Sequence, residues 1–241
     1  KKPADSSEKP VVVFRYAKNT AVYMVEHYLQ YPDGTYYLCE QKVSDEYPIG
    51  KWVTAEPNSY EGFTVKSGVN ERSGAVKDNN SLVLKVYYNR NSLTIQGREV
   101  KYDGNSYTVT VTVPGIAGDT VEYSEDGENW STTKPSYKNA GTYPVYARIE
   151  NSGKHSAAVS ADVVITKRQI TLTSASDEKV YDGQPLTKPE MTMTGDGFAD
   201  GEGLICNVTG TQTEVGESKN KLTYTLDKGT EAGNYEITKV E

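Results

Sequence analysis

The 241-residue sequence is poor in the residues on which most active sites and crosslinked folds depend. It has two cysteines, two histidines, two tryptophans and three phenylalanines. Cys39 and Cys206 fall in different predicted modules and in no metal-binding spacing, which excludes a disulfide framework within a module. Neither His27 nor His155 stands in a hydrolase or zinc-protease motif. We therefore expect two surface histidines, no cofactor and no enzymatic activity.

Long apolar runs and basic patches are also lacking. No run approaches the about 20 apolar residues that a membrane-spanning helix needs, so we expect no membrane insertion of this sequence. Basic residues do not alternate with stacking aromatics, and the net charge is −7, which argues against a nucleic-acid partner. The polar stretch from Lys1 to Pro10 resembles a linker, and no signal peptide is recognisable. We interpret the chain as a piece of a longer protein, a monomer whose anchoring segment lies outside it.

Tyrosine and β-branched residues, in contrast, are plentiful. The chain has 19 tyrosines, although only 36% of its residues are hydrophobic. This composition favours small β modules with thin cores over one thick core. Residues 108–113 alternate threonine and valine, the pattern of a strand with one buried face. We predict a mainly β, elongated chain of small modules without a long helix.

Two short motifs recur in the same order. Tyr-Asp-Gly occurs at 102–104 and 181–183, and Ala-Gly-x-Tyr follows at 140–143 and 232–235. We interpret these as two copies of one module, at 92–167 and 168–241, behind a differently patterned module at 20–91. The sequence between the copies has no glycine or proline, which predicts a stiff joint. The second copy either lacks its closing strand or is a shorter variant.

The segment before residue 92 has its own pattern. Pro32-Asp33-Gly34 between two alternating runs predicts a β-hairpin. Residues 52–56 are the best candidate for a helical turn, and residues 81–88 are expected to form the closing strand. Residues 1–19 are expected to be a linker or the terminal strand of a preceding module. The pattern is equally consistent with residues 11–18 forming the first strand of the module at 20–91.

One aromatic cluster is a candidate ligand site. Four tyrosines surround the predicted hairpin, with a tryptophan further along the chain: Tyr28, Tyr31, Tyr36, Tyr37 and Trp52. Aromatic rings beside polar groups hold sugars through their apolar faces and through hydrogen bonds. The alternative is that the tyrosines form cross-strand pairs that stabilise a sheet.

An acidic loop is a weaker candidate, for calcium. Asp196, Asp200 and Glu202 supply three carboxylates within seven residues, and calcium prefers oxygen ligands. The spacing does not match the EF-hand loop, and hairpin turns rich in glycine and aspartate have the same composition. We otherwise expect no metal.

Residues 20–91 resemble a known family of repeats. The matching segments are 25–30 (Val-Glu-His-Tyr-Leu-Gln), 33–36 (Asp-Gly-Thr-Tyr), 60–63 (Tyr-Glu-Gly-Phe) and 81–88 (Ser-Leu-Val-Leu-Lys-Val-Tyr-Tyr). They look like the mucin-binding-protein-type (MucBP-like) repeats of Gram-positive surface proteins. The resemblance implies a small β-grasp-like module found in tandem on the cell wall.

The rest of the chain resembles another repeat of the same class of proteins. Tyr-Asp-Gly at 102–104 and 181–183, Asn-Ala-Gly-Thr-Tyr at 139–143 and Gly-Asp-Gly-Phe at 195–198 are similar to MBG-type bacterial Ig-like repeats. The resemblance implies β-sandwich stalk modules without catalysis. We expect an extracellular, wall-anchored adhesin fragment that binds host mucin or glycan through residues 20–91. The alternative is a purely structural spacer.

Overall fold

The computed structural model describes residues 12–14 and 19–241. The expected linker or terminal strand at 1–19 therefore lies almost entirely outside the described residues. The chain separates into two compact units, one up to Asn91 and the other from Ser92 to Glu241. The described residues form strands, turns and two short 3-10 segments, η1 (Asn70–Arg72) and η2 (Ala232–Asn234), which makes this a mainly β protein of several small sheets. No helix in the described ranges has the length and hydrophobicity that a membrane crossing needs.

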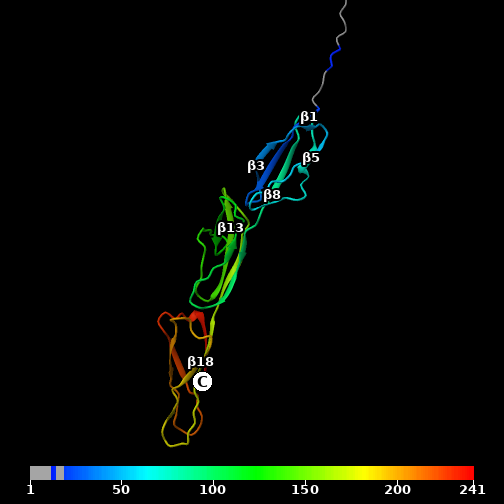
Figure 1. Cartoon of the computed structure of the whole chain (residues 1–241). Helices are drawn as coiled ribbons and strands as arrows, with labels where there is room; N and C mark the ends of the chain where they lie inside the picture. The colour runs from blue at the N-terminus through cyan, green and yellow to red at the C-terminus, as the bar shows by residue number, and fades with distance from the viewer. Residues whose placement is uncertain (1–11, 15–18) are drawn as a thin grey trace, which may run out of the picture. The chain divides into compact units, whose positions relative to one another are not determined.

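Unit 1 is built on a four-stranded sheet with the order β3-β2-β8-β6 (Figure 1). The central strands β2 and β8 run parallel, and the outer pairs are antiparallel. Two small antiparallel pairs, β1 with β4 and β5 with β7, complete the unit. The strands of unit 1 are β1 (Thr20–Ala21), β2 (Met24–Gln30), β3 (Tyr36–Val43), β4 (Tyr47–Pro48), β5 (Trp52–Thr54), β6 (Phe63–Val65), β7 (Ser73–Ala75) and β8 (Val83–Arg90).

The period-two pattern of β2 and β8 explains how unit 1 forms its core. Leu84, Val86 and Tyr88 alternate along β8 and are at most 1% exposed, beside Leu29 on β2. Val53 of β5 packs into the same cluster. The core therefore lies between the four-stranded sheet and the β5–β7 pair, and the other face of the sheet is left to solvent.

The predicted hairpin is present, whereas the predicted helical turn is wrong. Gly34 has a φ of +88°, and the N–H of Tyr31 donates to the carbonyl of Thr35 at 2.7 Å, closing the β2–β3 hairpin. Residues 52–54 form strand β5 instead of a helical turn, with Trp52 opposite Ala75 on β7. The pairing of this segment with β7 and the burial of Val53, which is 7% exposed, determine its strand conformation, because its local helix propensity is weak.

Unit 2 contains the two copies of the repeat. Its larger sheet has the order β10-β15-β13-β12, with β14 on β13; a second sheet has the order β18-β16-β22; and three antiparallel pairs accompany them. The strands are β9 (Thr94–Gln96), β10 (Arg98–Lys101), β11 (Thr110–Thr112), β12 (Thr120–Ser124), β13 (Gly141–Asn151), β14 (Lys154–His155), β15 (Val159–Thr166), β16 (Arg168–Ser174), β17 (Leu186–Thr187), β18 (Met191–Gly195), β19 (Leu204–Val208), β20 (Thr211–Gln212), β21 (Leu222–Leu226) and β22 (Tyr235–Val240).

The two copies share one core. β15 and β16 are separated only by Lys167, so the chain passes from one sheet to the next without a loop. A single hydrophobic cluster contains Val145 and Ile165 from the first copy and Leu172 and Tyr235 from the second. The expected strand at 108–113 is shorter, over Thr110–Thr112 only.

Candidate functional site

The structure divides the five predicted aromatic residues among three places. Tyr28 and Tyr36 lie on the solvent face of the four-stranded sheet of unit 1, next to Tyr87 of β8. The ring of Tyr28 stacks on that of Tyr87 with 5.0 Å between centroids and 19° between planes, and Tyr36 meets Tyr87 edge-on at 5.1 Å. We call Tyr28, Tyr36 and Tyr87 the tyrosine face.

The other predicted aromatics lie elsewhere in unit 1. Tyr31 and Tyr37 contact each other, with 4.4 Å between ring centroids, and Tyr37 packs against the core. Trp52 is 68% exposed and alternates with buried Val53, so it points away from the core on the side opposite the tyrosine face. Tyr87 was missed because its neighbour Tyr28 is reached through parallel β2–β8 pairing, which a hairpin pattern does not reveal.

Charged and polar groups surround the tyrosine face. The ammonium of Lys66 lies 5.2 Å from the ring centroid of Tyr36, and that of Lys85 lies 5.9 Å from that of Tyr28. Lysine ammonium groups at these distances are attracted to the ring faces. The rings therefore contact each other and two lysines, as in a sheet-stabilising ladder, while their edges stay accessible.

Two hydroxyl groups of the tyrosine face, those of Tyr28 and Tyr87, have raised pKa values and stay protonated at neutral pH. Tyr28 donates to the carboxylate of Glu26 at 2.6 Å, and this bond together with burial raises the pKa of Tyr28 to about 12. Burial, followed by the charge of Glu71, raises the pKa of Tyr87. Neutral hydroxyl groups next to a carboxylate and ammonium groups can form hydrogen bonds with a polar ligand. The tyrosine face contains no nucleophile paired with a base.

His27 is buried, contrary to the expectation of a surface histidine. It is 4% exposed because it shares the inner face of β2 with Leu29. Its Nδ1 lies 2.8 Å from the hydroxyl of Tyr88, which also accepts the N–H of Asn58 at 2.7 Å. His27 and Tyr88 therefore share one buried hydrogen bond, and which of the two is the donor depends on the histidine tautomer. Burial lowers the pKa of His27, and the charge of Glu40 offsets this in part.

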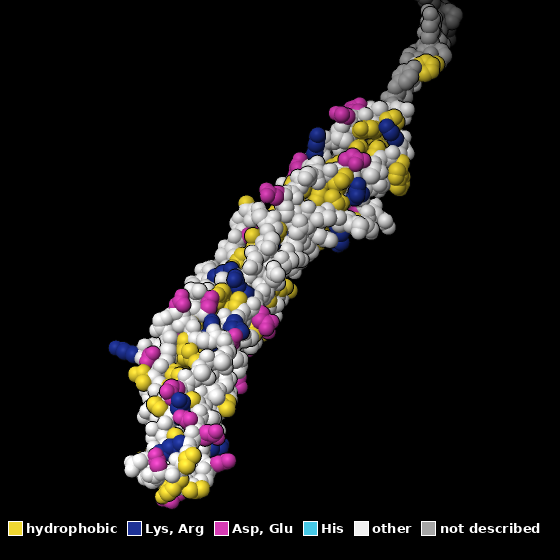
Figure 2. Space-filling view, turned by 60° about the horizontal axis from the view of Figure 1, so that its bottom comes forward, with side chains coloured by type: hydrophobic (Ala, Val, Ile, Leu, Met, Phe, Trp, Pro, Cys, Tyr) yellow, Lys and Arg dark blue, Asp and Glu magenta, His cyan; other side chains and the backbone are white. Residues whose placement is uncertain are grey.

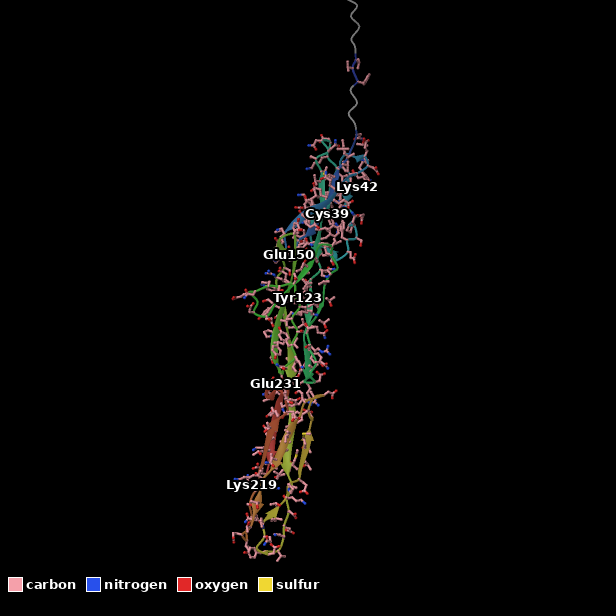
Figure 3. All side chains as sticks on the ribbon, turned by 90° about the vertical axis from the view of Figure 1, so that its left-hand side faces the viewer. Cys39, Lys42, Tyr123, Glu150, Lys219 and Glu231 are labelled. Atoms are coloured by element: carbon pink, nitrogen blue, oxygen red, sulfur yellow. The ribbon has the colours of Figure 1, made fainter. Side chains whose placement is uncertain are left out.

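His155 and the two cysteines give no reactive site. His155 is exposed on β14, with Nε2 3.4 Å from a carboxylate oxygen of Glu122. Cys39, labelled in Figure 3, is exposed on β3, Cys206 is half-buried on β19, and both thiols are free. Figure 2 shows acidic and basic side chains interspersed over the visible surface, without a broad patch of one sign.

A group of polar residues lies between the two copies in unit 2, and of these the sequence analysis singled out only Glu202, as a calcium candidate. Arg168 opens β16, and its guanidinium donates to three carbonyl oxygens: Gly197 at 2.7 Å, Tyr102 at 3.0 Å, and Asp196. One carboxylate, that of Glu202, accepts the hydroxyls of both Tyr102 and Tyr235. We call Tyr102, Arg168, Glu202, Asn234 and Tyr235 the junction network.

Three members of the junction network are buried: Tyr102 is 1% exposed, Asn234 1% and Tyr235 4%. The charged members are half-buried. The side-chain oxygen of Asn234 accepts the N–H of Ala140 at 2.7 Å, and the hydroxyl of Tyr235 accepts the N–H of Ala199 at 3.0 Å. Buried polar groups whose hydrogen bonds are all formed fix the two copies in one relative arrangement, because any other arrangement would leave a buried donor or acceptor unpaired.

The acidic loop belongs to this junction. Asp196 forms an ion pair with Lys101 and accepts the N–H of Gln169 at 2.8 Å, which together lower its pKa. Glu202 is occupied by the two tyrosine hydroxyls, and Asp200 is exposed. Among the described residues no group of three or more histidine, cysteine, aspartate or glutamate side chains is arranged to hold a metal. Two of the three candidate calcium ligands therefore have protein partners.

The two repeated motifs could have indicated this junction. Tyr102 belongs to the first Tyr-Asp-Gly motif, while Asn234 and Tyr235 belong to the second Ala-Gly-x-Tyr motif. From the sequence we interpret both motifs only as marks of a repeated module, although a tyrosine at the same place in two copies also fits a contact between copies. Neither the models of known protein families nor the curated proteins contain a match to this chain.

Proposed function

We propose that this chain is a non-catalytic segment of an extracellular, wall-anchored adhesin of a Gram-positive bacterium. Its β modules act as a stalk, and residues 20–91 carry a contact surface for host mucin or glycan. The anchoring segment belongs to a part of the protein outside this chain. The resemblance of the ordered motifs to MucBP-like and MBG-type repeats supports the proposal.

One observation carries the stalk role: the guanidinium of Arg168 binds the carbonyl oxygen of Tyr102 in the first copy and those of Asp196 and Gly197 in the second. Arg168 stands two residues after the end of β15, where a flexible linker would otherwise allow the copies to swing. Hydrogen bonds to a charged group contribute about 1.5–3 kcal/mol each. A joint of this kind resists bending, which is the property that a stalk needs.

The proposed modules are 20–91, 92–167 and 168–241. A β-grasp-like identity for the first agrees with the central parallel pair of β2 and β8, the first long strand and the last. For the other two, the parallel pairs β10–β15 and β16–β22 depart from the antiparallel sheets of an immunoglobulin sandwich. We therefore propose that they are Ig-like in their layering and not in their strand order.

The tyrosine face is the proposed ligand surface, because its rings present edges and neutral hydroxyls next to Glu26 and two lysines. Protein–glycan contacts use this combination of apolar ring and hydrogen-bonding rim. The second candidate function is a purely structural spacer. It is favoured by the mutual stacking of Tyr28 and Tyr87, which stabilises the sheet without a ligand.

The whole chain, passed over immobilised mucin with and without its glycans, separates the two functions. For the adhesin we expect retention on glycosylated mucin only, and a loss of at least about tenfold in affinity for Tyr28→Ala. The variant Trp52→Ala, on the opposite side of unit 1, is the matched control and should bind like the parent chain. No retention of the parent chain on either surface would favour the spacer.

A further inference from the structure

Two segments of unit 2 precede the same Tyr-Asp-Gly motif, but only the first of them is paired with a neighbouring strand. Arg98-Glu99-Val100-Lys101 and Asp177-Glu178-Lys179-Val180 both run into Tyr-Asp-Gly. The first is strand β10, which pairs in parallel with β15 from Arg98 opposite Val163 to Lys101 opposite Thr166. The N–H of Tyr102 then donates to the carbonyl of Thr166 at 2.9 Å, and Tyr102 is 1% exposed.

The second segment has no strand beside it. Residues 179–181 make no backbone–backbone hydrogen bond within the described part of the chain. Val180 is 90% exposed and Tyr181 is 58% exposed. A row of free N–H and C=O groups with exposed apolar side chains is an open template for an added strand.

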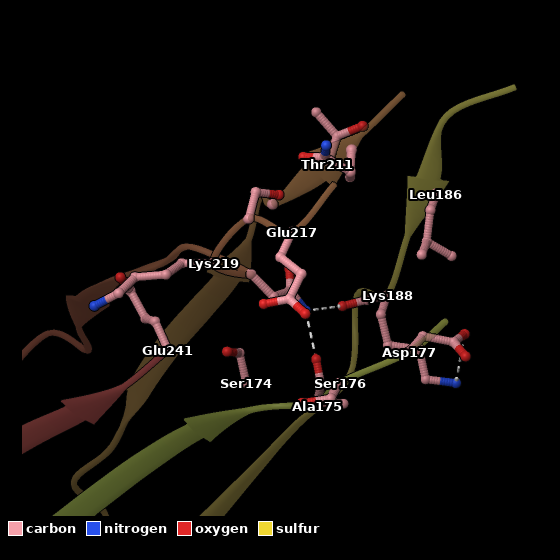
Figure 4. A pocket seen from close by; sticks show the side chains of 14 residues that line it. Ser174, Ala175, Ser176, Asp177, Leu186, Lys188, Thr211, Glu217, Lys219 and Glu241 are labelled. Carbon is pink, nitrogen blue, oxygen red and sulfur yellow. Dashed lines mark hydrogen bonds and ion pairs between the residues drawn. The ribbon is translucent and has the colours of Figure 1, made fainter. Parts of the chain in front are cut away.

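A groove lies beside this open segment. Two hollows of about 500 Å³ and about 610 Å³ share Asp177, Leu186 and Gln212 in their walls, and Tyr181 and Val215 line the second. Figure 4 shows Leu186 on one wall of the first hollow and Thr211 on another. Hydrophobic side chains gather at the lower end of the view in Figure 2, and Val215 is 83% exposed. The side-chain oxygen of Asn220, which lines the first hollow, is buried and accepts no hydrogen bond from the described residues.

Strand β15, which pairs with the first segment, indicates the kind of strand that fits beside the second. Val163 and Ile165 of β15 are 0% and 2% exposed, and they belong to the same core cluster as Tyr102. Two basic residues follow β15, Lys167 and Arg168. The charged side chains that line the groove are acidic on balance. They are five carboxylates (Asp177, Glu178, Glu214, Glu217 and Glu241) and three lysines (Lys179, Lys188 and Lys219). A strand with β-branched side chains at alternate positions and a basic end is therefore complementary in shape and in charge.

We propose that residues 177–181 are an acceptor edge that binds an extended strand in parallel, with the chemistry of β15 followed by basic residues. Backbone hydrogen bonds along 177–181 supply the affinity, and the groove takes the alternate β-branched side chains, as in other cases of strand addition. This acceptor edge is in unit 2, so it is independent of the ligand surface proposed for unit 1.

A synthetic peptide with the sequence of residues 161–168 tests the proposal on the whole chain. We expect saturable binding and an at least tenfold slowing of amide hydrogen exchange at residues 179 and 181, whose N–H groups face the added strand in the register of β10 with β15. A peptide with glutamate in place of the residues equivalent to Val163 and Ile165 should give neither effect.

Two variants at one position distinguish strand pairing at this edge from non-specific binding of the peptide. By the register of β10 with β15, the N–H of residue 179 faces the added strand. Lys179→Pro removes this backbone donor and should abolish the protection, whereas Lys179→Thr keeps the donor and should retain it. Circular dichroism and the thermal midpoint verify that both variants fold. Protection at another strand edge, binding that survives Lys179→Pro, or no binding at millimolar peptide would each overturn the proposal.

Discussion

The backbone N–H of Ala140 donates a 2.7 Å hydrogen bond to the side-chain oxygen of Asn234. Ala140 stands in the first Ala-Gly-x-Tyr motif and Asn234 in the second, so the recurrence that reveals the repeat also supplies a contact between its copies. The amide of Asn234 donates in turn to the side chain of Asn139 at 3.2 Å. The junction network is thus a largely buried, polar link, and its loss has measurable consequences.

Replacing Arg168 with alanine should destabilise unit 2. Three carbonyl oxygens lose their donor. Arg168 is half-buried, so water replaces part of these bonds, and we expect the free energy of unfolding to fall by about 2–3 kcal/mol, less than the sum of three bonds to a charged group. Urea unfolding, followed by circular dichroism, measures this change. Lys167→Ala, one residue earlier and exposed, is the control and should stay within about 0.5 kcal/mol of the parent. Equal effects of the two substitutions would contradict the role assigned to the guanidinium.

Unit 2 should lose stability at alkaline pH. Burial, and then the hydrogen bond to Glu202, raises the pKa values of Tyr102 and Tyr235 to about 12. Both tyrosines titrate near pH 10 in the unfolded chain. Their contribution is therefore complete below about pH 10 and is lost as the pH rises through about 12.

Urea unfolding at a series of pH values between 8 and about 12 follows this loss. In a Tyr102→Phe, Tyr235→Phe double variant the fall in stability should be shallower, because two of the shifted groups are gone. An unchanged slope would show that other groups cause the alkaline transition.

Unit 1 should lose stability in mild acid. Burial holds the pKa of His27 below its ordinary value of about 6.5, so the unfolded chain takes up a proton more readily than the folded one. The stabilisation is present above about pH 6.5 and is lost as the pH falls through the folded pKa. In the protonated imidazole both ring nitrogens carry a hydrogen, so the hydrogen bond to the Tyr88 hydroxyl must then be donated by Nδ1.

A His27→Gln variant should depend less on pH between 7 and about 5 than the parent chain. His155→Gln lies in unit 2 and is the control for the substitution, because it should leave the pH dependence of unit 1 as in the parent chain. An NMR titration of the His27 imidazole reports the direction directly. A His27 pKa above the ordinary value of about 6.5 would contradict the assignment.

Calcium should not stabilise the chain. The carboxylates of Asp196 and Glu202 already bind Lys101, Gln169 and two tyrosine hydroxyls, so a metal would have to displace protein partners. A specific site occupied at 100 times its Kd would add about 2.7 kcal/mol. We expect equal thermal midpoints in calcium and in EDTA. A midpoint that rises with calcium concentration, and not with magnesium, would restore the metal site.

The sequence by itself determined the mainly β class, the hairpin at Pro32-Asp33-Gly34 and the positions of the repeated motifs. These depend on local signals: side-chain alternation with period two, and glycine at positions of positive φ. The same alternation placed His27 beside Leu29 on one face of β2. The burial of His27 was therefore open to prediction, and the lack of a catalytic motif was too weak a reason to expect it at the surface.

Only the tertiary structure decided which residues of distant segments meet. The parallel pairing of β2 with β8 brought Tyr87 to Tyr28 and left Trp52 on the other side of unit 1. The continuation of β15 into β16 placed Arg168 among carbonyl oxygens and turned the acidic loop into a junction. Contacts of this kind depend on strand order and register, which a local pattern does not encode, because any alternating strand can pair with any other.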